Sequence, residues 1–295
     1  MSFPPVRRLG PDDLKRCVAL SVDRGWSPER AKWSLLLAAS EVFGADAPDG
    51  RGLAGAVVLT RWAADYAAVG MMLVAARYGR LGLGRALMEH VLHAAGDAAT
   101  VTLFATDMGR PLYEKLGFAA VRRNVSFVGR FRSSPAASPA GSPGSVRPAA
   151  QADLPAILAL DRAAFGADRG QILTRLPALA DQVAVFAAGG PAGPGSAGPG
   201  IAGYGAAWRV APALTVIGPL VAPDGEAAKR LIEALAARAP TPVRLDLDPD
   251  RKELPGWAHA RGLEPAGRTV VMARGELTPR GTPGRLFTPI SVALA

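Results

Sequence analysis

Three glycines and two arginines lie close together in one short stretch of the chain: Gly79, Gly82, Gly84, Arg80 and Arg85. Glycine allows the backbone to approach a ligand closely and to point successive N–H groups into one concavity. The guanidinium groups, and the N-terminus of a helix that begins there, add positive charge. The stretch therefore predicts a binding site for a pyrophosphate. The alternative is a tight turn that only connects two elements.

The elements on either side of this turn are predicted by their apolar pattern. Residues 66–74 form an apolar run of strand length, bounded by turn signals. Residues 83–95 have helical spacing, because their apolar side chains fall on one face: Leu83, Leu87, Met88, Val91, Leu92 and Ala95. The turn is thus expected to join a strand end to a helix start. A dinucleotide fingerprint is excluded because Leu87 stands where its third glycine belongs, and the chain contains no Walker loop.

Tyr113 is the second candidate for chemistry. It begins the string Tyr-Glu-Lys-Leu-Gly-Phe, which ends at Phe118. A tyrosine has an ordinary pKa of about 10, so it is protonated at neutral pH and can give its proton to a thiolate of pKa about 8.5. The alternative is that its ring only packs in the core beside Leu112 and Leu116.

These two motifs together resemble those of the GNAT N-acetyltransferases, over roughly residues 6–132. That family's loop pattern is Arg/Gln-x-x-Gly-x-Gly/Ala after a strand, and its later pattern is Tyr-x-x-x-Gly-Phe. The resemblance implies acetyl-CoA as co-substrate and Tyr113 as the general acid. We expect a strand N–H near Leu73 to meet the oxyanion, because a splayed strand end offers unpaired donors. The chain departs from the pattern at Gly79, where the family has Arg or Gln, which affects the pyrophosphate affinity. The implied cofactor-binding residues are Leu73, Val74, Gly79, Arg80, Gly82, Leu83, Gly84 and Arg85.

The length of 295 residues favours two domains, and the sequence divides accordingly. Residues 133–145 contain no charge and no large apolar side chain, which predicts a flexible linker. We therefore expect a catalytic domain over 1–132 and a second domain over 146–295. A similar stretch, residues 189–200, lies between two strand-like runs and is predicted to be a hairpin loop.

The two halves resemble each other at three places. Val6-Arg7 with Asp13-Leu14 recurs at an offset of 140, and Leu116-Gly117-Phe118 has a counterpart at an offset of 145. Residues 69–73 resemble residues 217–221, at an offset of 148. Similar offsets in the same order indicate a duplication. The chain also resembles a tandem, two-domain branch of the GNAT superfamily, in which strings like Gly25-Trp26 with Trp33, residues 161–169 and Ile217-Gly218-Pro219-Leu220 recur. This resemblance implies an α+β fold with two GNAT-like domains, each a mixed, mostly antiparallel sheet flanked by helices.

The second copy lacks both chemical elements. Asp224 and Glu226 stand where the glycine turn would be, and carboxylates repel a pyrophosphate. Ala258 stands at the position of Tyr113. Residues 146–295 are therefore expected to be a degenerate, non-catalytic GNAT-like domain that shapes the acceptor site.

The acceptor site and the general base are less defined by the sequence. Trp26 lies just outside the start of a predicted helix, and Trp33 lies two turns into it. The two rings are expected either to line a site for an amine or an aromatic substrate, or to pack that helix on the sheet. Asp168 and Asp224 are candidates to meet a cationic amine. The candidates for the base are Asp107, Glu41 and a chain of waters; for Asp107 we favour a role as a turn or helix cap.

Composition sets further bounds. The net charge of +9 comes mostly from scattered arginines, so we expect attraction of an anionic cofactor and no nucleic-acid partner. The single cysteine, Cys17, is predicted to lie in the core, and no His/Cys/Asp cluster has metal spacing. The sequence contains no membrane-length apolar run and no leader, which predicts a cytoplasmic protein with no membrane partner. The function expected is acetyl transfer to an amine of a small molecule; the alternative is an acyl-CoA sensor or scaffold without turnover.

Overall fold

The computed structural model describes residues 3–96, 100–133, 144–187, 200–211, 213–251, 253–276 and 280–294. The chain forms two compact units, and neither is a single stretch of sequence. Unit 1 contains residues 1–122, 269–277 and 292–295, and unit 2 contains residues 123–268 and 278–291. Among the helices of the described ranges, none has the length and apolar character that a membrane span requires.

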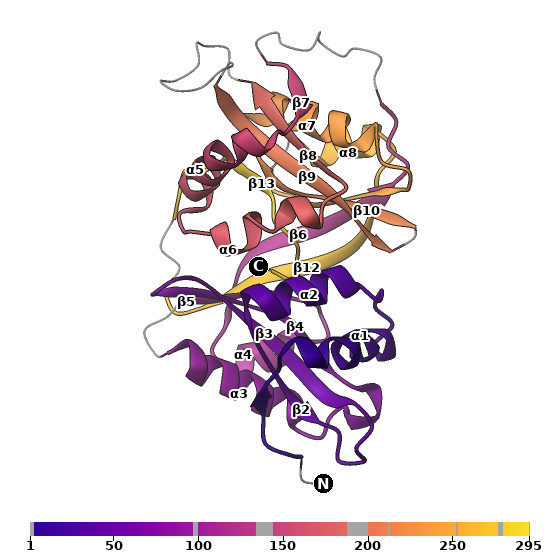
Figure 1. Ribbon diagram of the computed structural model, residues 1–295, viewed down its shortest axis with the longest axis vertical. Coiled ribbons are helices and arrows are strands. Elements are labelled where there is room, and N and C mark those ends of the chain that lie inside the picture. The colour runs from indigo at the N-terminus through magenta and orange to yellow at the C-terminus, as the bar shows by residue number, and fades with distance from the viewer. Residues whose placement is uncertain are drawn as a thin grey trace. The chain divides into compact units, whose positions relative to one another are not determined.

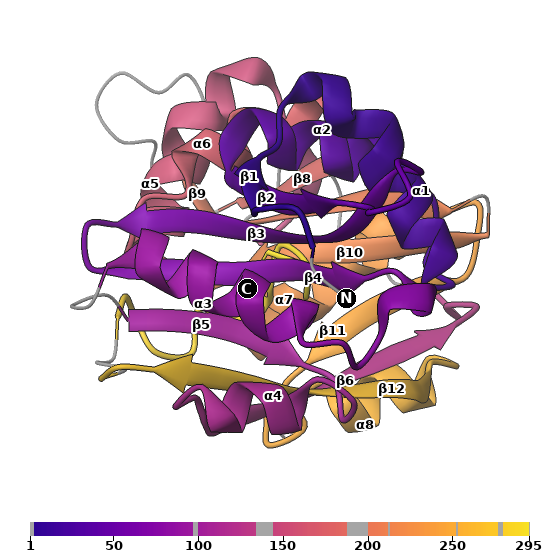
Figure 2. The same cartoon turned by 90° about the horizontal axis from the view of Figure 1, so that it is seen from below.

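Unit 1 is a sheet covered by helices on both faces (Figures 1 and 2). Strands β1 to β5 follow one another in the sheet in sequence order, and all neighbours are antiparallel except β4 and β5. Its elements are β1 (Arg7–Arg8), α1 (Leu14–Asp23), α2 (Arg30–Ala39), β2 (Glu41–Asp46), β3 (Leu53–Ala63), β4 (Tyr66–Val74), α3 (Leu83–Ala95), β5 (Thr100–Ala105) and α4 (Arg110–Lys115).

The predicted strand and helix around the glycine turn are confirmed, because β4 and α3 have the bounds that the apolar pattern gave. The apolar face of α3 is buried and packs on β3 and β4. Helices α1 and α2 lie on the opposite face of the sheet (Figures 1 and 2). Since both faces are covered, β3 is buried almost along its whole length. Cys17 on α1 is fully buried, which confirms that it is a core residue.

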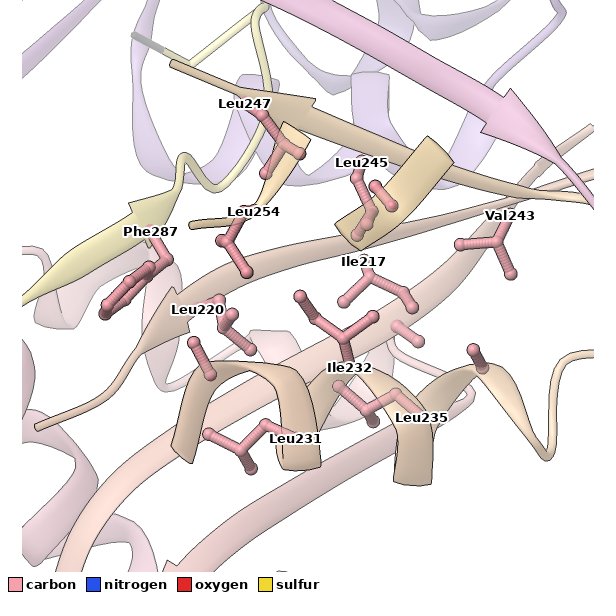
Figure 3. Close-up of a cluster of buried hydrophobic side chains, with 14 of the residues drawn as sticks. Ile217, Leu220, Leu231, Ile232, Leu235, Val243, Leu245, Leu247, Leu254 and Phe287 are labelled. Carbon is pink, nitrogen blue, oxygen red and sulfur yellow. The ribbon is translucent and has the colours of Figure 1, made fainter. Parts of the chain in front are cut away.

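Unit 2 repeats this plan. Its elements are β7 (Val146–Pro148), α5 (Leu154–Phe165), α6 (Gly170–Leu173), β8 (Gln182–Ala187), β9 (Ile201–Ala211), β10 (Leu214–Val221), α7 (Gly225–Ala236), β11 (Val243–Leu247), α8 (Pro255–Ala260) and β13 (Leu286–Thr288). Figure 3 shows its core, in which Ile232 of α7 points toward Ile217 of β10. Leu231 and Leu235 of the same helix pack close to Gly203 and Gly205 of β9. Strands β8 and β9 pair antiparallel, as expected of a hairpin, and the predicted loop between them lies, up to residue 199, outside the described residues.

Two strands are shared by the units, and this differs from the predicted division at residues 133–145. Strand β6 (Ala119–Gly129) begins in unit 1, and its later residues pair with β11 of unit 2. Strand β12 (Glu264–Arg274) begins in unit 2, and its residues from Val270 pair with β5 of unit 1. Each unit therefore takes a strand from the other half of the sequence. Most of the predicted linker, residues 134–143, lies outside the described residues.

The duplication is visible in contacts that recur at the predicted offsets. Arg7 pairs with Asp13 in unit 1, and Arg147 pairs with Asp153 in unit 2. In the strand pairs β3–β4 and β9–β10, Val69 faces Leu59 as Ile217 faces Ala207, and both pairs carry a bulge directly afterwards. The offset is 148 for both members of these pairs, the value that the sequence comparison gave.

Candidate active site

The central feature of unit 1 is a split between two neighbouring strands. Strands β4 and β5 pair in parallel from Tyr66 with Thr100 to Val69 with Leu103. Beyond Val69 this pairing ends, although β4 continues to Val74. The register of β4 against β3 shifts within the same stretch, where Met71 has a positive φ of 47°. The bulge bends β4 and leaves its last residues, Leu73 and Val74, on the open side of the split.

The glycine turn follows at the open end of this split. It runs from Ala75 to Gly82, which is the N-cap residue of α3. Gly82 has a φ of +86°, and no atom lies within 4 Å of the position a Cβ would take. Arg80 also has a positive φ, of 63°. Since Gly82 has no side chain to cap the helix, the first N–H groups of α3 are available to an anion.

Gly84 has a different role from Gly82. A Cβ at Gly84 would lie 2.9 Å from Met72 Cε, 3.6 Å from Leu112 Cδ2 and 3.6 Å from Val74 Cγ2. This glycine therefore allows the first turn of α3 to pack closely on β4 and on α4. The predicted cofactor-binding residues Leu73, Val74, Gly79, Leu83 and Gly84 thus lie around one strand end and one helix N-terminus.

The two arginines of the turn differ in their partners. Arg85 forms an ion pair with Glu89 on the exposed face of α3, with 2.7 Å between Nε and Oε1. Arg80 is exposed and forms no ion pair with another described residue. A third arginine that the sequence reasoning missed, Arg77, lies near the start of the turn and pairs with Asp49. Arg80 is therefore the cation of the turn that is available to a ligand.

Tyr113 lies on α4, next to Leu112, which packs at Gly84. Its side chain is buried, and its ring makes an edge contact with Phe118, with 6.0 Å between the ring centroids. Burial raises the pKa of Tyr113 to about 12, so the phenol is held in its protonated form. Its hydroxyl forms no hydrogen bond with any described residue. The arrangement is compatible with both expected roles, a proton donor and a packed ring.

The structure separates the candidates for the base. Thr106, which the sequence reasoning missed, caps the turn before α4: its hydroxyl oxygen accepts from the N–H of Gly109 at 3.3 Å, and its carbonyl accepts from the N–H of Gly109 and Arg110 at 3.0 and 2.9 Å. The favoured capping role of Asp107 is thus taken by Thr106, and Asp107 is exposed. Glu41 forms ion pairs with Arg61 at 2.6 Å and with Arg8 at 3.4 Å, which makes it part of an ion-pair cluster on β1, β2 and β3.

The two tryptophans are placed in different environments. Trp33 is fully buried, and its Nε1 donates to Ser21 Oγ at 2.8 Å. This favours the packing role for Trp33. Trp26 lies between α1 and α2 and is 43% exposed, so its ring remains open to a ligand. Close to it, Asp23 at the end of α1 accepts from the N–H of Ala76 at 2.6 Å, which ties this helix to the start of the glycine turn.

Unit 2 lacks the loop and the tyrosine at the matching places. Only residues 222–224 separate β10 from α7, and Asp224 caps the helix by accepting from Ala227 N at 2.8 Å. The helix N-terminus thus already holds a carboxylate. Ala258 occupies the matching place of Tyr113: Leu263 N donates to Ala258 O as Phe118 N donates to Tyr113 O, both at 3.0 Å. Asp168, the other predicted acceptor-binding carboxylate, is bound by Arg162 and by Gly170 N.

A strand from the end of the chain fills the split of unit 2. Strands β10 and β11 pair from Thr215 to Ile217 and then separate, as β4 and β5 do after Val69. In unit 2, β13 pairs antiparallel with β10 at Leu220 and Val221, and Ala222 N donates to Arg285 O at 3.0 Å. Figure 3 shows Phe287 of β13 beside Leu220 and Leu254 in the core. No local motif in the sequence marked this strand.

The comparisons identify the family. Residues 37–130 and residues 157–288 match two models that are each described as an acetyltransferase (GNAT) domain. The chain belongs to the GNAT acetyltransferase family and carries two GNAT domains in tandem. The predicted fold class and tandem organisation are thereby confirmed. Within the described residues, no group of three His, Cys, Asp or Glu side chains is placed to hold a metal ion.

Several proteins resemble this GNAT protein. The uncharacterized N-acetyltransferase YitH of Bacillus subtilis is 28% identical over 191 residues, which cover 63% of this chain and only 62% of YitH. A putative acetyltransferase from Pyrococcus horikoshii has a similar fold, with a TM-score of 0.77, 17% identity, and 99% and 95% of the two chains covered. A tandem GNAT protein from the clavulanic acid biosynthesis pathway also has a similar fold, with a TM-score of 0.66 and 16% identity. The match covers 93% of this chain and 99% of that one. These two structural similarities concern the fold alone.

Proposed function

We propose that unit 1 transfers an acetyl group from acetyl-CoA to an amine of a small molecule. The observation that supports this most is the split between β4 and β5, which opens directly onto the uncapped N-terminus of α3. Acetyl-CoA fits such a site because it has a pyrophosphate at one end of an extended arm that carries the acetyl group. The phosphates bind at the turn, and the arm lies along β4. Arg80 adds a full positive charge at the phosphate end.

The reaction requires three contributions from the chain. Main-chain N–H near Leu73 donates to the thioester oxygen, which becomes negative when the amine nitrogen bonds to the carbonyl carbon. When the C–S bond breaks, Tyr113 gives its proton to the leaving sulfur. The amine loses its extra proton to solvent, directly or through Asp107, which is exposed. Glu41 is less suited to the role of base because two arginines hold it.

Unit 2 is proposed to bind no acyl-CoA. Three observations support this: β13 occupies the strand split, Asp224 caps the helix N-terminus, and Ala258 stands in place of the tyrosine. Asp168 and Asp224 both have local partners in unit 2, so we propose that Trp26, whose ring is 43% exposed, contacts the acceptor in their place. The acceptor is therefore a small amine with an apolar or aromatic part.

Substitution of Gly82→Glu tests the cofactor site. The new side chain adds negative charge beside the pyrophosphate at a position of positive φ. We expect acetyl-CoA affinity to fall by more than about tenfold, which is over about 1.4 kcal/mol. Gly96→Glu is the matched control, because Gly96 also has a positive φ and open space but lies at the other end of α3. Calorimetry showing two CoA per chain, or unchanged affinity in Gly82→Glu, would contradict the assignment.

The alternative function is an acyl-CoA sensor without turnover. The two differ in one measurement, the release of free thiol from acetyl-CoA in the presence of a panel of small amines. Saturable binding of acetyl-CoA with no amine-dependent thiol release and no acetylated product across the panel would favour the sensor.

A further inference from the structure

The last residues of the chain lie against matching glycines of both units. In unit 2, a Cβ at Gly218 would lie 2.3 Å from the carbonyl oxygen of Pro289. In unit 1, a Cβ at Gly70 would lie 1.9 Å from the carbonyl oxygen of Ala293. Gly70 and Gly218 correspond in the duplication, since Val69 matches Ile217 in register. One segment of chain therefore covers the closed end of the strand split in each unit.

In unit 1 the face on which this tail lies can be assigned. A Cβ at Gly55 would touch Leu83 and Leu87 of α3, so Gly55 faces α3. Gly70 is paired with Val58, which points to the other face of β3 because side chains alternate along a strand. The main chain of Ala293 thus covers Gly70 on the face opposite α3, and the side chains of Ala293 and Leu294 are buried.

This position matters for the acyl group of the donor. If the cofactor arm enters from the glycine turn and lies along Val74 and Leu73, the acyl group points toward Gly70, about 10 Å further along the strand. The split closes there, because Val69 is paired with Leu103. A longer acyl chain must therefore leave the plane of the sheet. On the α3 face Met72 packs where Gly84 approaches β4, and on the other face the tail covers Gly70.

We propose that residues Val292–Leu294 close the acyl end of the site in unit 1 and restrict the donor to short acyl groups such as acetyl. This inference rests on the proposed function, since it assumes that acyl-CoA binds along β4. It assigns a specificity-determining role to a segment whose preceding residues, in β13, fill the corresponding split of unit 2.

The test is the binding of CoA, acetyl-CoA, butyryl-CoA and hexanoyl-CoA to the full chain by calorimetry. We expect hexanoyl-CoA to bind at least about tenfold more weakly than acetyl-CoA, because the longer chain meets a packed wall. Equal affinities for acetyl-CoA and hexanoyl-CoA in the wild type would overturn the inference while leaving the proposed function intact. Failure to bind any of the four, CoA included, would overturn both.

Two variants examine the tail directly. Removing residues 292–295 should bring hexanoyl-CoA to within about threefold of acetyl-CoA, because the main chain that covers Gly70 and the buried side chains of Ala293 and Leu294 are then absent. Gly70→Ala should also weaken the discrimination by displacing Ala293, whereas the matched Gly218→Ala, which displaces Pro289 in unit 2, should leave it unchanged. Acetyl-CoA affinity reports whether each variant is folded. Variants of the tail or of Gly70 that bind acetyl-CoA and still discriminate against hexanoyl-CoA as the wild type does would contradict the role of the tail. If these variants do not fold, the comparison of acetyl-CoA with hexanoyl-CoA in the wild type decides.

Discussion

At the scale of single residues, Tyr113 is the side chain on which the proposed mechanism depends most. Tyr113→Phe removes the hydroxyl and keeps the ring, so its contact with Phe118 should remain. We expect turnover to fall by about 10²- to 10⁴-fold, the usual loss for a positioned acid, with acetyl-CoA affinity nearly unchanged. Steady-state kinetics and a binding titration measure the two effects. Tyr66→Phe, at the far end of β4, is the control. Equal turnover in wild type and Tyr113→Phe would return Tyr113 to a packing role.

The protonation of carboxylates gives a second prediction at this scale. Asp13 accepts from both nitrogens of the Arg7 fork, at 2.8 and 3.0 Å, and this lowers its pKa from 3.8 to about 2. A lowered pKa in the folded state stabilises the fold above pH 3.8, and the contribution is lost as the pH falls through about 2. Asp13→Asn should therefore lose less stability than the wild type as the pH falls from 3.8 to about 2. Thermal unfolding of the wild type and of Asp13→Asn across this pH range measures the difference. Melting temperatures that fall equally with pH in the two proteins would contradict the prediction.

At the scale of elements, a buried ion pair holds α5 to the start of α6. Asp161 accepts from Arg169 Nη2 at 2.6 Å and from the Tyr204 hydroxyl at 2.5 Å, and all three side chains are buried. Arg169→Met leaves the Asp161 carboxylate buried without its cation, which should destabilise the fold by about 3–5 kcal/mol. Arg162→Ala breaks only the exposed pair with Asp168 and should cost at most about 1 kcal/mol. Urea unfolding of the two variants compares them; equal losses would refute the difference.

Elements also show how far the sequence could predict this protein. The apolar pattern located β4 and α3 because periodicity is a local property, and the offset of 148 matched residues of β4 and β10 that occupy corresponding places in the two units. The pairing of β12 with β5, and of β13 with β10, could not be predicted this way. Such pairs join residues far apart in the chain, and a strand such as Leu286–Thr288 is too short to carry a pattern. The role of Trp33 was left open because a buried and a ligand-facing tryptophan look alike in sequence.

At the scale of the whole molecule, the exchanged strands determine how the chain responds to cutting. Unit 1 needs residues 269–277, which lie beyond the predicted linker. In a fragment of residues 1–132, β5 would lose its partner from Val270 to Arg274 and expose an unpaired edge that carries Val101 and Leu103. Unpaired apolar edges associate with other chains. We therefore expect this fragment to aggregate or to be unfolded.

The matching prediction concerns the full chain cut within the linker. A protease site placed near Ser138 should give two pieces that stay together under native conditions, because each compact unit contains strands from both sides of the cut. Size-exclusion chromatography of the nicked protein should show one species of the intact mass, which separates only in denaturant. Acetyl-CoA binding should persist, since β4, the glycine turn and their neighbours remain assembled. Separation of the pieces without denaturant, with a stable monomeric 1–132 fragment, would show that the exchanged strands are dispensable and that unit 1 is complete before the linker.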